Sequence, residues 1–191
     1  MLTVAPTVLA ARLPYARVTT ALLVVAFAVL TGLSAQWVIY LPGNPVPITG
    51  QTLVVLLGGA TLGVRAGVAS SVLYLAMGAA GLPFFAGGES GFDTFTAPSA
   101  GYLVGFVAAS AVVGRLAERK ADRTFSTMLV AFLAGSAVIY LFGVTGLVLT
   151  TDMGVTAAVS NGVYPFVIGD LIKAGAAGVL TPTAWKLTKT R

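Results

Sequence analysis

Long runs of apolar residues, separated by short polar or glycine- and proline-rich segments, dominate the pattern of the chain. Runs of this kind with few charges are typical of helices that cross a membrane. The pattern predicts an all-α integral membrane protein with six transmembrane helices, forming a single transmembrane domain over residues 1–191. The predicted spans cover approximately residues 18–40, 51–64, 68–82, 99–114, 128–149 and 163–185.

Prolines and glycines mark two of the boundaries between these spans. Pro42, Pro45 and Pro47 follow the first span, where they exclude a helix and predict a rigid loop. Two glycines in residues 63–67 predict a tight turn between the second and third spans. The second span is then short, since about 14 residues extend only ~21 Å against a hydrocarbon core of ~30 Å.

The longest segment outside the predicted spans covers residues 83–98 and contains several phenylalanines, including Phe92. It is too apolar for an ordinary solvated loop, and its glycines allow unusual backbone angles. We expect this segment to act as a lid over a binding site, with Phe92 among the ligand-binding residues. The alternative is a re-entrant loop that only packs against the helices.

The composition supports the membrane assignment independently. The chain is 57% hydrophobic and 9% charged, with a mean hydropathy of +0.95, whereas soluble domains carry about 25% charged residues. It contains no cysteine and no histidine, which excludes disulfides, metal sites built on these residues and a serine nucleophile with a histidine base. There is also no Walker A pattern for ATP. We expect no catalytic residue, no metal, no cofactor and no enzymatic activity.

The distribution of charge predicts the orientation in the membrane. Every Lys and Arg except Lys173 lies in the N-terminal segment, near Arg65, in residues 115–123 or in the C-terminal tail. Six spans would bring all four regions to one side, while the other side would hold only acidic residues in its loops. By the positive-inside rule, both termini are predicted to be cytoplasmic. The net charge of +5 then reflects membrane orientation rather than nucleic-acid binding.

Lys173 and Asp170 both lie within the last apolar run. Residues three apart share one face of a helix, and charges at bilayer depth usually face a cavity, a partner or a ligand because they are costly in lipid. We expect the pair to bind, from the outer side, a small ligand with adjacent donor and acceptor groups, such as a urea or an amide. The alternative is a buried salt bridge that satisfies itself.

Other polar side chains lie near the predicted outer ends of the spans. Gln51 and Thr52 begin the second span, where they either bind the ligand or cap the helix, with Thr49 as a plausible N-cap. Tyr102 and Tyr164 either anchor the chain at the membrane interface or line the site. The predicted substrate-binding residues are therefore Asp170, Lys173, Gln51, Thr49, Tyr102, Tyr164 and Phe92.

Small residues spaced four apart occur in the first and fourth spans. The pairs are Ala28 and Gly32, Thr31 and Ala35, and Gly101 and Gly105. Such spacing lets helices approach closely. We expect most of these residues to pack within the chain, and the small residues of the first span to be the best candidates for docking another membrane subunit.

Several segments resemble the signatures of the BioY family. They are residues 46–52 (VPITGQT) with 56–59 (LLGG), 81–88 (GLPFFAGG), 97–106 (APSAGYLVGF) and 165–173 (PFVIGDLIK). The similarity extends over about residues 20–178, and the conjunction of these segments is specific to the family.

The resemblance implies the biotin-binding S component of an energy-coupling factor (ECF) transporter, an ABC-type importer of the prokaryotic cell membrane. Such subunits are six-helix proteins with the vitamin site near the outer surface. They work with a transmembrane coupling subunit and a pair of cytoplasmic ATPases, which bind the ATP. A polar end of biotin would meet Asp170 and Lys173. The alternatives are an S component for another vitamin or a membrane protein without a transport role.

Overall fold

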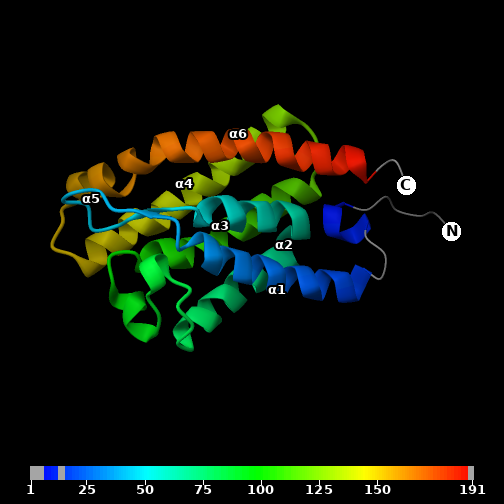
Figure 1. The fold of residues 1–191 in the computed structure, drawn as a ribbon. Coiled ribbons are helices and arrows are strands. Elements are labelled where there is room, and N and C mark those ends of the chain that lie inside the picture. The colour runs from blue at the N-terminus through cyan, green and yellow to red at the C-terminus, as the bar shows by residue number, and fades with distance from the viewer. Residues whose placement is uncertain (1–6, 13–15, 189–191) are drawn as a thin grey trace.

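The computed structural model describes residues 7–12 and 16–188, and this part of the chain is built mainly of helices (Figure 1). After a 3₁₀ turn η1 (Leu9–Arg12), the α-helices are α1 (Ala16–Ser34), α2 (Gln51–Ala79), α3 (Ala100–Glu118), α4 (Phe125–Thr150), α5 (Val155–Gly162) and α6 (Tyr164–Leu187). Among the described residues, four helical stretches are long and apolar enough to cross a membrane, and α1 adds a shorter apolar helix. The predicted all-helical membrane class is confirmed.

Helix α2 folds back on itself at Gly63. The backbone there has φ 79° and ψ −176°, a conformation outside the helical region that glycine adopts readily. Beyond this point Gly67 returns to Gly59, where an added Cβ would lie 2.9 Å from the Gly59 Cα. Further along, the Gln51 amide donates to the Tyr74 hydroxyl at 2.5 Å. The two arms of α2, residues 51–62 and 64–79, are therefore antiparallel, and the predicted glycine turn is confirmed.

Helix α1 ends at Ser34, whereas the predicted first span continued to residue 40. The chain instead turns into strand β1 (Val38–Ile39), which pairs antiparallel with β2 (Ile48–Thr49). The proline-rich residues between the strands form the tip of this small hairpin, so the predicted non-helical loop is present. The hairpin matters for the site because it returns the chain beside the end of α1, where Gly50 N–H donates to the Ser34 carbonyl at 3.2 Å.

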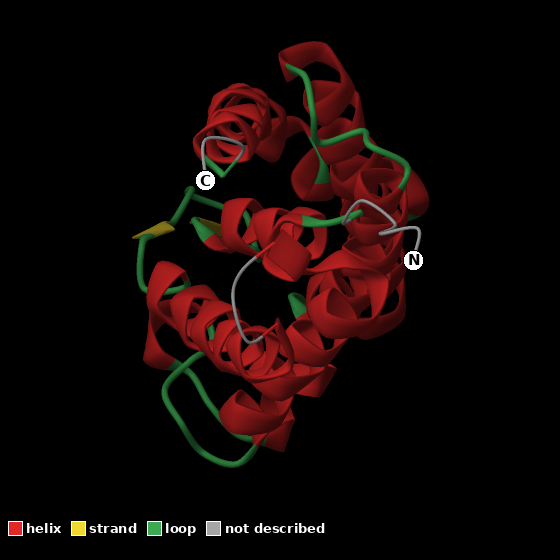
Figure 2. Cartoon of the chain, turned by 90° about the vertical axis from the view of Figure 1, so that its right-hand side faces the viewer, coloured by secondary structure: helices red, strands yellow, loops and turns green. Residues whose placement is uncertain are grey.

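Two short 3₁₀ turns, η2 (Ala86–Gly88) and η3 (Phe92–Thr96), shape the segment between α2 and α3. In Figure 1 this green segment lies at the end of the bundle opposite to η1. Figure 2 views the bundle from the η1 end and shows the short strands at its edge. The molecule thus separates into one end with the loops and strands and another with η1 and the end of α6.

The close helix approaches are internal to the chain. A Cβ on Gly101 would lie 2.8 Å from the Gly146 Cα, so α3 and α4 nearly touch there, as small residues allow. The predicted docking residues at the end of α1 are all buried, namely Ala28, Thr31, Gly32 and Ala35. This chain's own side chains cover these positions, as Phe84 does at Gly32, so they serve the internal packing that was expected of most small residues; docking of a partner through α1 stays a prediction.

A cluster around Trp185 holds the η1 end of the bundle together. The buried Trp185 indole donates to the buried Asp122 carboxylate, which also pairs with Arg123 at 3.1 Å. The Arg123 guanidinium stacks on the indole, 3.2 Å from the ring centroid, and Arg12 lies 4.9 Å from it. Burial raises the pKa of Asp122 despite these partners. The α3–α4 loop, η1 and the end of α6 are thereby joined.

Replacing Trp185 with phenylalanine removes the indole donor from a buried carboxylate. We expect Trp185→Phe to destabilise the protein by about 1–3 kcal/mol, the usual cost of leaving such a group without a partner. The measurement is the thermal midpoint of the purified protein in detergent. Trp37→Phe is the matched control, since Trp37 is 78% exposed. Equal midpoints for the two variants would show that the indole–carboxylate bond does not stabilise this end.

Candidate functional site

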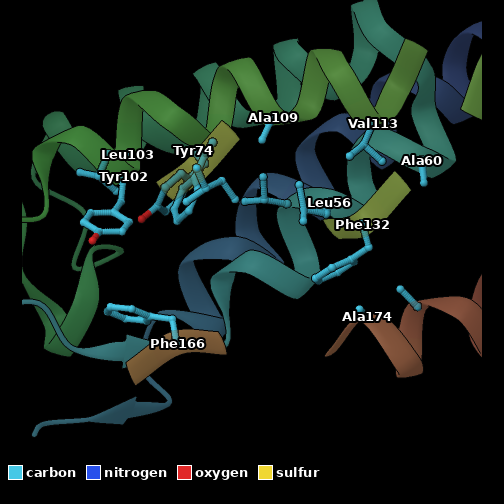
Figure 3. Close-up of a cluster of buried hydrophobic side chains, with 14 of the residues drawn as sticks. Leu56, Ala60, Tyr74, Tyr102, Leu103, Ala109, Val113, Phe132, Phe166 and Ala174 are labelled. Atoms are coloured by element: carbon cyan, nitrogen blue, oxygen red, sulfur yellow. The ribbon is translucent and has the colours of Figure 1, made fainter. Parts of the chain in front are cut away.

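A cavity with about 580 Å³ of empty space, including the solvent at its open side, lies at the loop-bearing end of the bundle. Its wall is formed by the β1–β2 hairpin, the start of α2, the 83–98 segment, α3, α4 and α6. Figure 3 shows Tyr102 and Phe166, which both line it, facing each other at one end of the buried core, with their ring centroids 5.8 Å apart. Most of the lining is aromatic or aliphatic, with a few polar groups concentrated on α2 and α6. This combination is typical of a small-molecule site.

Lys173 and Asp170 contribute the charges of this wall. The Lys173 Nζ lies 3.0 Å from Asp170 Oδ1, and the two side chains are 16% and 4% exposed. Lys173 also donates to the Thr49 carbonyl at 2.9 Å and to Thr52 Oγ1 at 2.6 Å. Because an ammonium has three N–H donors, Lys173 is fully hydrogen-bonded within the chain. It joins the middle of α6 to the beginning of α2.

Asp170 accepts hydrogen bonds from three helices. Its Oδ1 accepts from Lys173 and from the Thr52 hydroxyl at 3.2 Å, and its Oδ2 accepts from the Tyr140 hydroxyl at 2.7 Å. A carboxylate offers about four acceptor positions, so about one is left unused by the chain, and Asp170 is a lining residue of the cavity. The pair is thus a satisfied buried ion pair, and both of its side chains line the cavity; its role in ligand binding stays a prediction.

Gln51 and Thr49 extend the polar part of the wall. The Thr49 hydroxyl donates to Gln51 Oε1 at 2.8 Å, while Gln51 Nε2 donates to the fully buried Tyr74 on the second arm of α2. Both the oxygen and the nitrogen of the Gln51 amide are thus hydrogen-bonded within the chain. Gly50, rather than Thr49, occupies the N-cap position of α2, and the Thr49 hydroxyl accepts only a long bond of 3.4 Å from the Gln51 N–H.

The predicted residues divide into those at the cavity and those outside it. Asp170, Lys173, Gln51, Thr49 and Tyr102 line the cavity, and Tyr102 also donates to the Gly162 carbonyl at 2.7 Å.

Tyr164 and Phe92 do not line this cavity. Tyr164 is 67% exposed at the first turn of α6, and Phe92 is 76% exposed on the outer side of η3, where its ring packs beside Phe95. Their positions near predicted helix ends and in an apolar loop were correct, but the direction of a side chain depends on tertiary packing. The structure therefore places both residues away from the other predicted ligand contacts.

Several lining residues were absent from the predicted set. The sequence could have indicated Tyr140, because this residue places a hydroxyl inside an apolar span, where polar groups usually have a function. Phe85, Phe106 and Phe166 also line the cavity, but phenylalanine is common in membrane helices and carried no distinguishing pattern. Thr52 lies next to Gln51, and its contact with Lys173 follows only from the packing of α2 against α6.

Both loops that were expected near the site contribute to its wall. Val46 and Pro47 come from the hairpin, and Phe85, Ala86 and Thr94 come from the 83–98 segment. Their placement over the polar groups is consistent with a covering role, while opening and closing of the segment stays a prediction.

Removing the Tyr140 hydroxyl tests its bond to Asp170 without changing the shape of the side chain. We expect Tyr140→Phe to destabilise the ligand-free protein by about 1–3 kcal/mol, because Asp170 Oδ2 loses its donor in a buried position. Thermal unfolding in detergent measures the effect. Tyr164→Phe is the matched control, because that ring is exposed. Tyr140→Phe unfolding at the wild-type temperature would contradict the assignment.

Comparison with known proteins adds two kinds of similarity. A model of the protein family described as the BioY family matches residues 7–190. The chain is 36% identical over 167 residues to the "Biotin transporter BioY" of Rhizobium etli, covering 84% of this chain and 86% of that protein. It is 37% identical over 149 residues to the protein of the same name from Thermotoga maritima, covering 78% and 86%.

The fold is similar to a solved structure. The crystal structure of "the S-component for biotin from an ECF-type ABC transporter" superposes with a TM-score of 0.82, covering 91% of this chain and 94% of that one. The sequence identity is 23%, so this similarity concerns the arrangement of the helices.

Proposed function

The chain belongs to the BioY family, and we propose that it is the biotin-binding S component of an ECF-type importer in a prokaryotic cell membrane. It captures biotin from the outer side and delivers it inward together with a membrane coupling subunit and cytoplasmic ATPases, and it is not an enzyme. The observation that carries this proposal is the cavity whose wall combines the buried carboxylate of Asp170, with about one acceptor position unused by the chain, and a mostly aromatic and aliphatic lining.

The chemistry of biotin suits this cavity. Its ureido ring carries two N–H donors and a carbonyl, its second ring is an apolar thioether, and its tail ends in a carboxylate. We assign the ureido end to Asp170, because a carboxylate accepts N–H donors and repels another carboxylate. The aromatic side chains Tyr102, Phe106 and Phe166 then surround the apolar ring. Lys173 sets the orientation of Asp170 through their ion pair, so it acts on the ligand through that carboxylate.

The proposed topology has six membrane crossings. They are α1, the two arms of α2, α3, α4 and α6, with the cavity toward the outer side and the Trp185 cluster toward the cytoplasm. The basic residues Arg115, Arg119 and Arg123 near the α3–α4 loop support this orientation through the positive-inside rule. Both termini are then cytoplasmic; residues 1–6 and 189–191 themselves lie outside the described part of the chain. The whole chain, residues 1–191, is proposed to act as a single transmembrane domain.

Binding of biotin to purified variants tests the site. We expect Asp170→Asn and Lys173→Ala each to weaken binding at least about tenfold, which corresponds to ~1.4 kcal/mol. Titration calorimetry or binding of radiolabelled biotin measures the change. Phe92→Leu and Tyr164→Phe are controls that should keep the wild-type affinity, since both side chains lie outside the cavity.

Lys173→Ala leaves a buried carboxylate without its counter-charge, which destabilises proteins by about 3–5 kcal/mol. The double variant Asp170→Asn/Lys173→Met avoids this imbalance and keeps the test valid if the single variant fails to fold. Wild-type affinity in the folded double variant would remove the pair from the ligand site. Tighter binding of another vitamin by the wild-type protein would instead identify a different ligand.

Cysteine labelling tests the topology cleanly, because the natural chain has no cysteine. In intact cells, a membrane-impermeant maleimide should label Asp152→Cys, in the exposed α4–α5 connection. It should label Arg119→Cys, at the exposed end of α3, only after the membrane is permeabilised. The reverse pattern would invert the proposed orientation.

A further inference from the structure

Gln36 lies outside the cavity, in the turn that follows α1, yet it contacts the segment that forms part of the cavity wall. Its Nε2 lies 3.0 Å from the Gly32 carbonyl, 3.1 Å from that of Pro83 and 3.2 Å from that of Phe85. The first acceptor belongs to α1 and the other two to the 83–98 segment. One side-chain amide therefore connects the end of α1 to the beginning of the segment that covers the site.

Phe84, between the two bonded carbonyls, is seated against α1 as well. An added Cβ on Gly32 would lie 2.6 Å from the Phe84 Cδ2, so the ring occupies space that only glycine leaves free. Gln36 follows Gly32 by four residues, so its amide and the Phe84 contact at Gly32 both lie at the end of α1. Together they hold Phe84 and the carbonyls on both sides of it in register with that helix.

The Phe85 backbone is held by Gln36, and the Phe85 side chain lines the cavity. It is 1% exposed, lines the cavity, and packs edge-on against Tyr74 and Phe95 with ring centroids 5.8 Å from each. Tyr74 in turn accepts the hydrogen bond from Gln51, another lining residue. Displacing the Phe85 backbone would therefore disturb the aromatic wall and the residue that holds the Gln51 amide.

We propose that Gln36 is a positioning residue for ligand retention: by donating to the Pro83 and Phe85 carbonyls, it keeps the 83–98 segment closed over the cavity. This inference rests on the proposed function for the identity of the ligand. Gln36 acts through Phe85 and does not itself contact the ligand. Since the amide is anchored on α1, a displacement of α1 is transmitted to the segment through this contact.

The first test measures opening of the segment without any ligand. Thr94 lines the cavity and is 6% exposed, so Thr94→Cys in this cysteine-free chain reports when the segment opens. Gln36→Met keeps the length of the side chain but has no donor, and we expect it to raise the rate of maleimide labelling of Thr94→Cys by a factor of about three to ten, the effect of losing one typical hydrogen bond. Gln36→Lys keeps N–H donors and should restore slow labelling.

The second test uses biotin. We expect Gln36→Met to raise the dissociation rate of radiolabelled biotin by a similar factor of about three to ten, and Gln36→Lys to return it toward the wild-type rate. The thermal midpoint of the ligand-free protein should be nearly unchanged by either variant. Two results would overturn the proposal. One is a general loss of stability in Gln36→Met that Gln36→Lys does not restore; the other is labelling and dissociation rates of Gln36→Met equal to those of the wild type.

The two tests separate this inference from the proposed function. If the wild-type protein fails to bind biotin, the proposed function fails, while the labelling rates of Thr94→Cys still decide the role of Gln36. If biotin binds and all three proteins exchange it equally, the function stands and the positioning role is wrong.

Discussion

The ion pair of Lys173 and Asp170 is the interaction on which the rest of the site depends. A charge at membrane depth needs partners, and this pair obtains them from Thr49 at the end of β2, Thr52 at the start of α2 and Tyr140 on α4. The start of α2 must therefore lie against the middle of α6. The β1–β2 hairpin and the reversal at Gly63 allow this, because they bring a short arm of α2 to the loop-bearing end.

Satisfying the pair and leaving it available to a ligand are compatible in this geometry. Lys173 uses all three donors within the chain, whereas Asp170, which lines the cavity, keeps about one acceptor position unused. The ligand-free protein thus avoids an unpaired charge, and a ligand with N–H donors can bind without first breaking the pair. Biotin has donors of this kind in its ureido ring, and the aromatic lining matches the apolar remainder of the molecule.

Features set by local chemistry could be predicted from the sequence. Glycine at position 63 and the prolines after α1 determine backbone angles themselves, and the turn and the loop occur where they were expected. The spacing of Asp170 and Lys173 on one helix face was likewise readable. Other features depend on packing between distant segments, which the pattern of a single sequence does not contain. They are the residue at which α1 ends, the outward direction of Phe92 and Tyr164, and the burial of the small residues of α1.

The most direct test of the central claim, that this cavity holds biotin, is native mass spectrometry of the wild-type protein purified without added ligand. We predict a fraction of the chain carrying one non-covalently bound biotin, and complete conversion to that species after incubation with biotin. Failure to form the complex with added biotin, or retention of a different small molecule that biotin does not displace, would contradict the account.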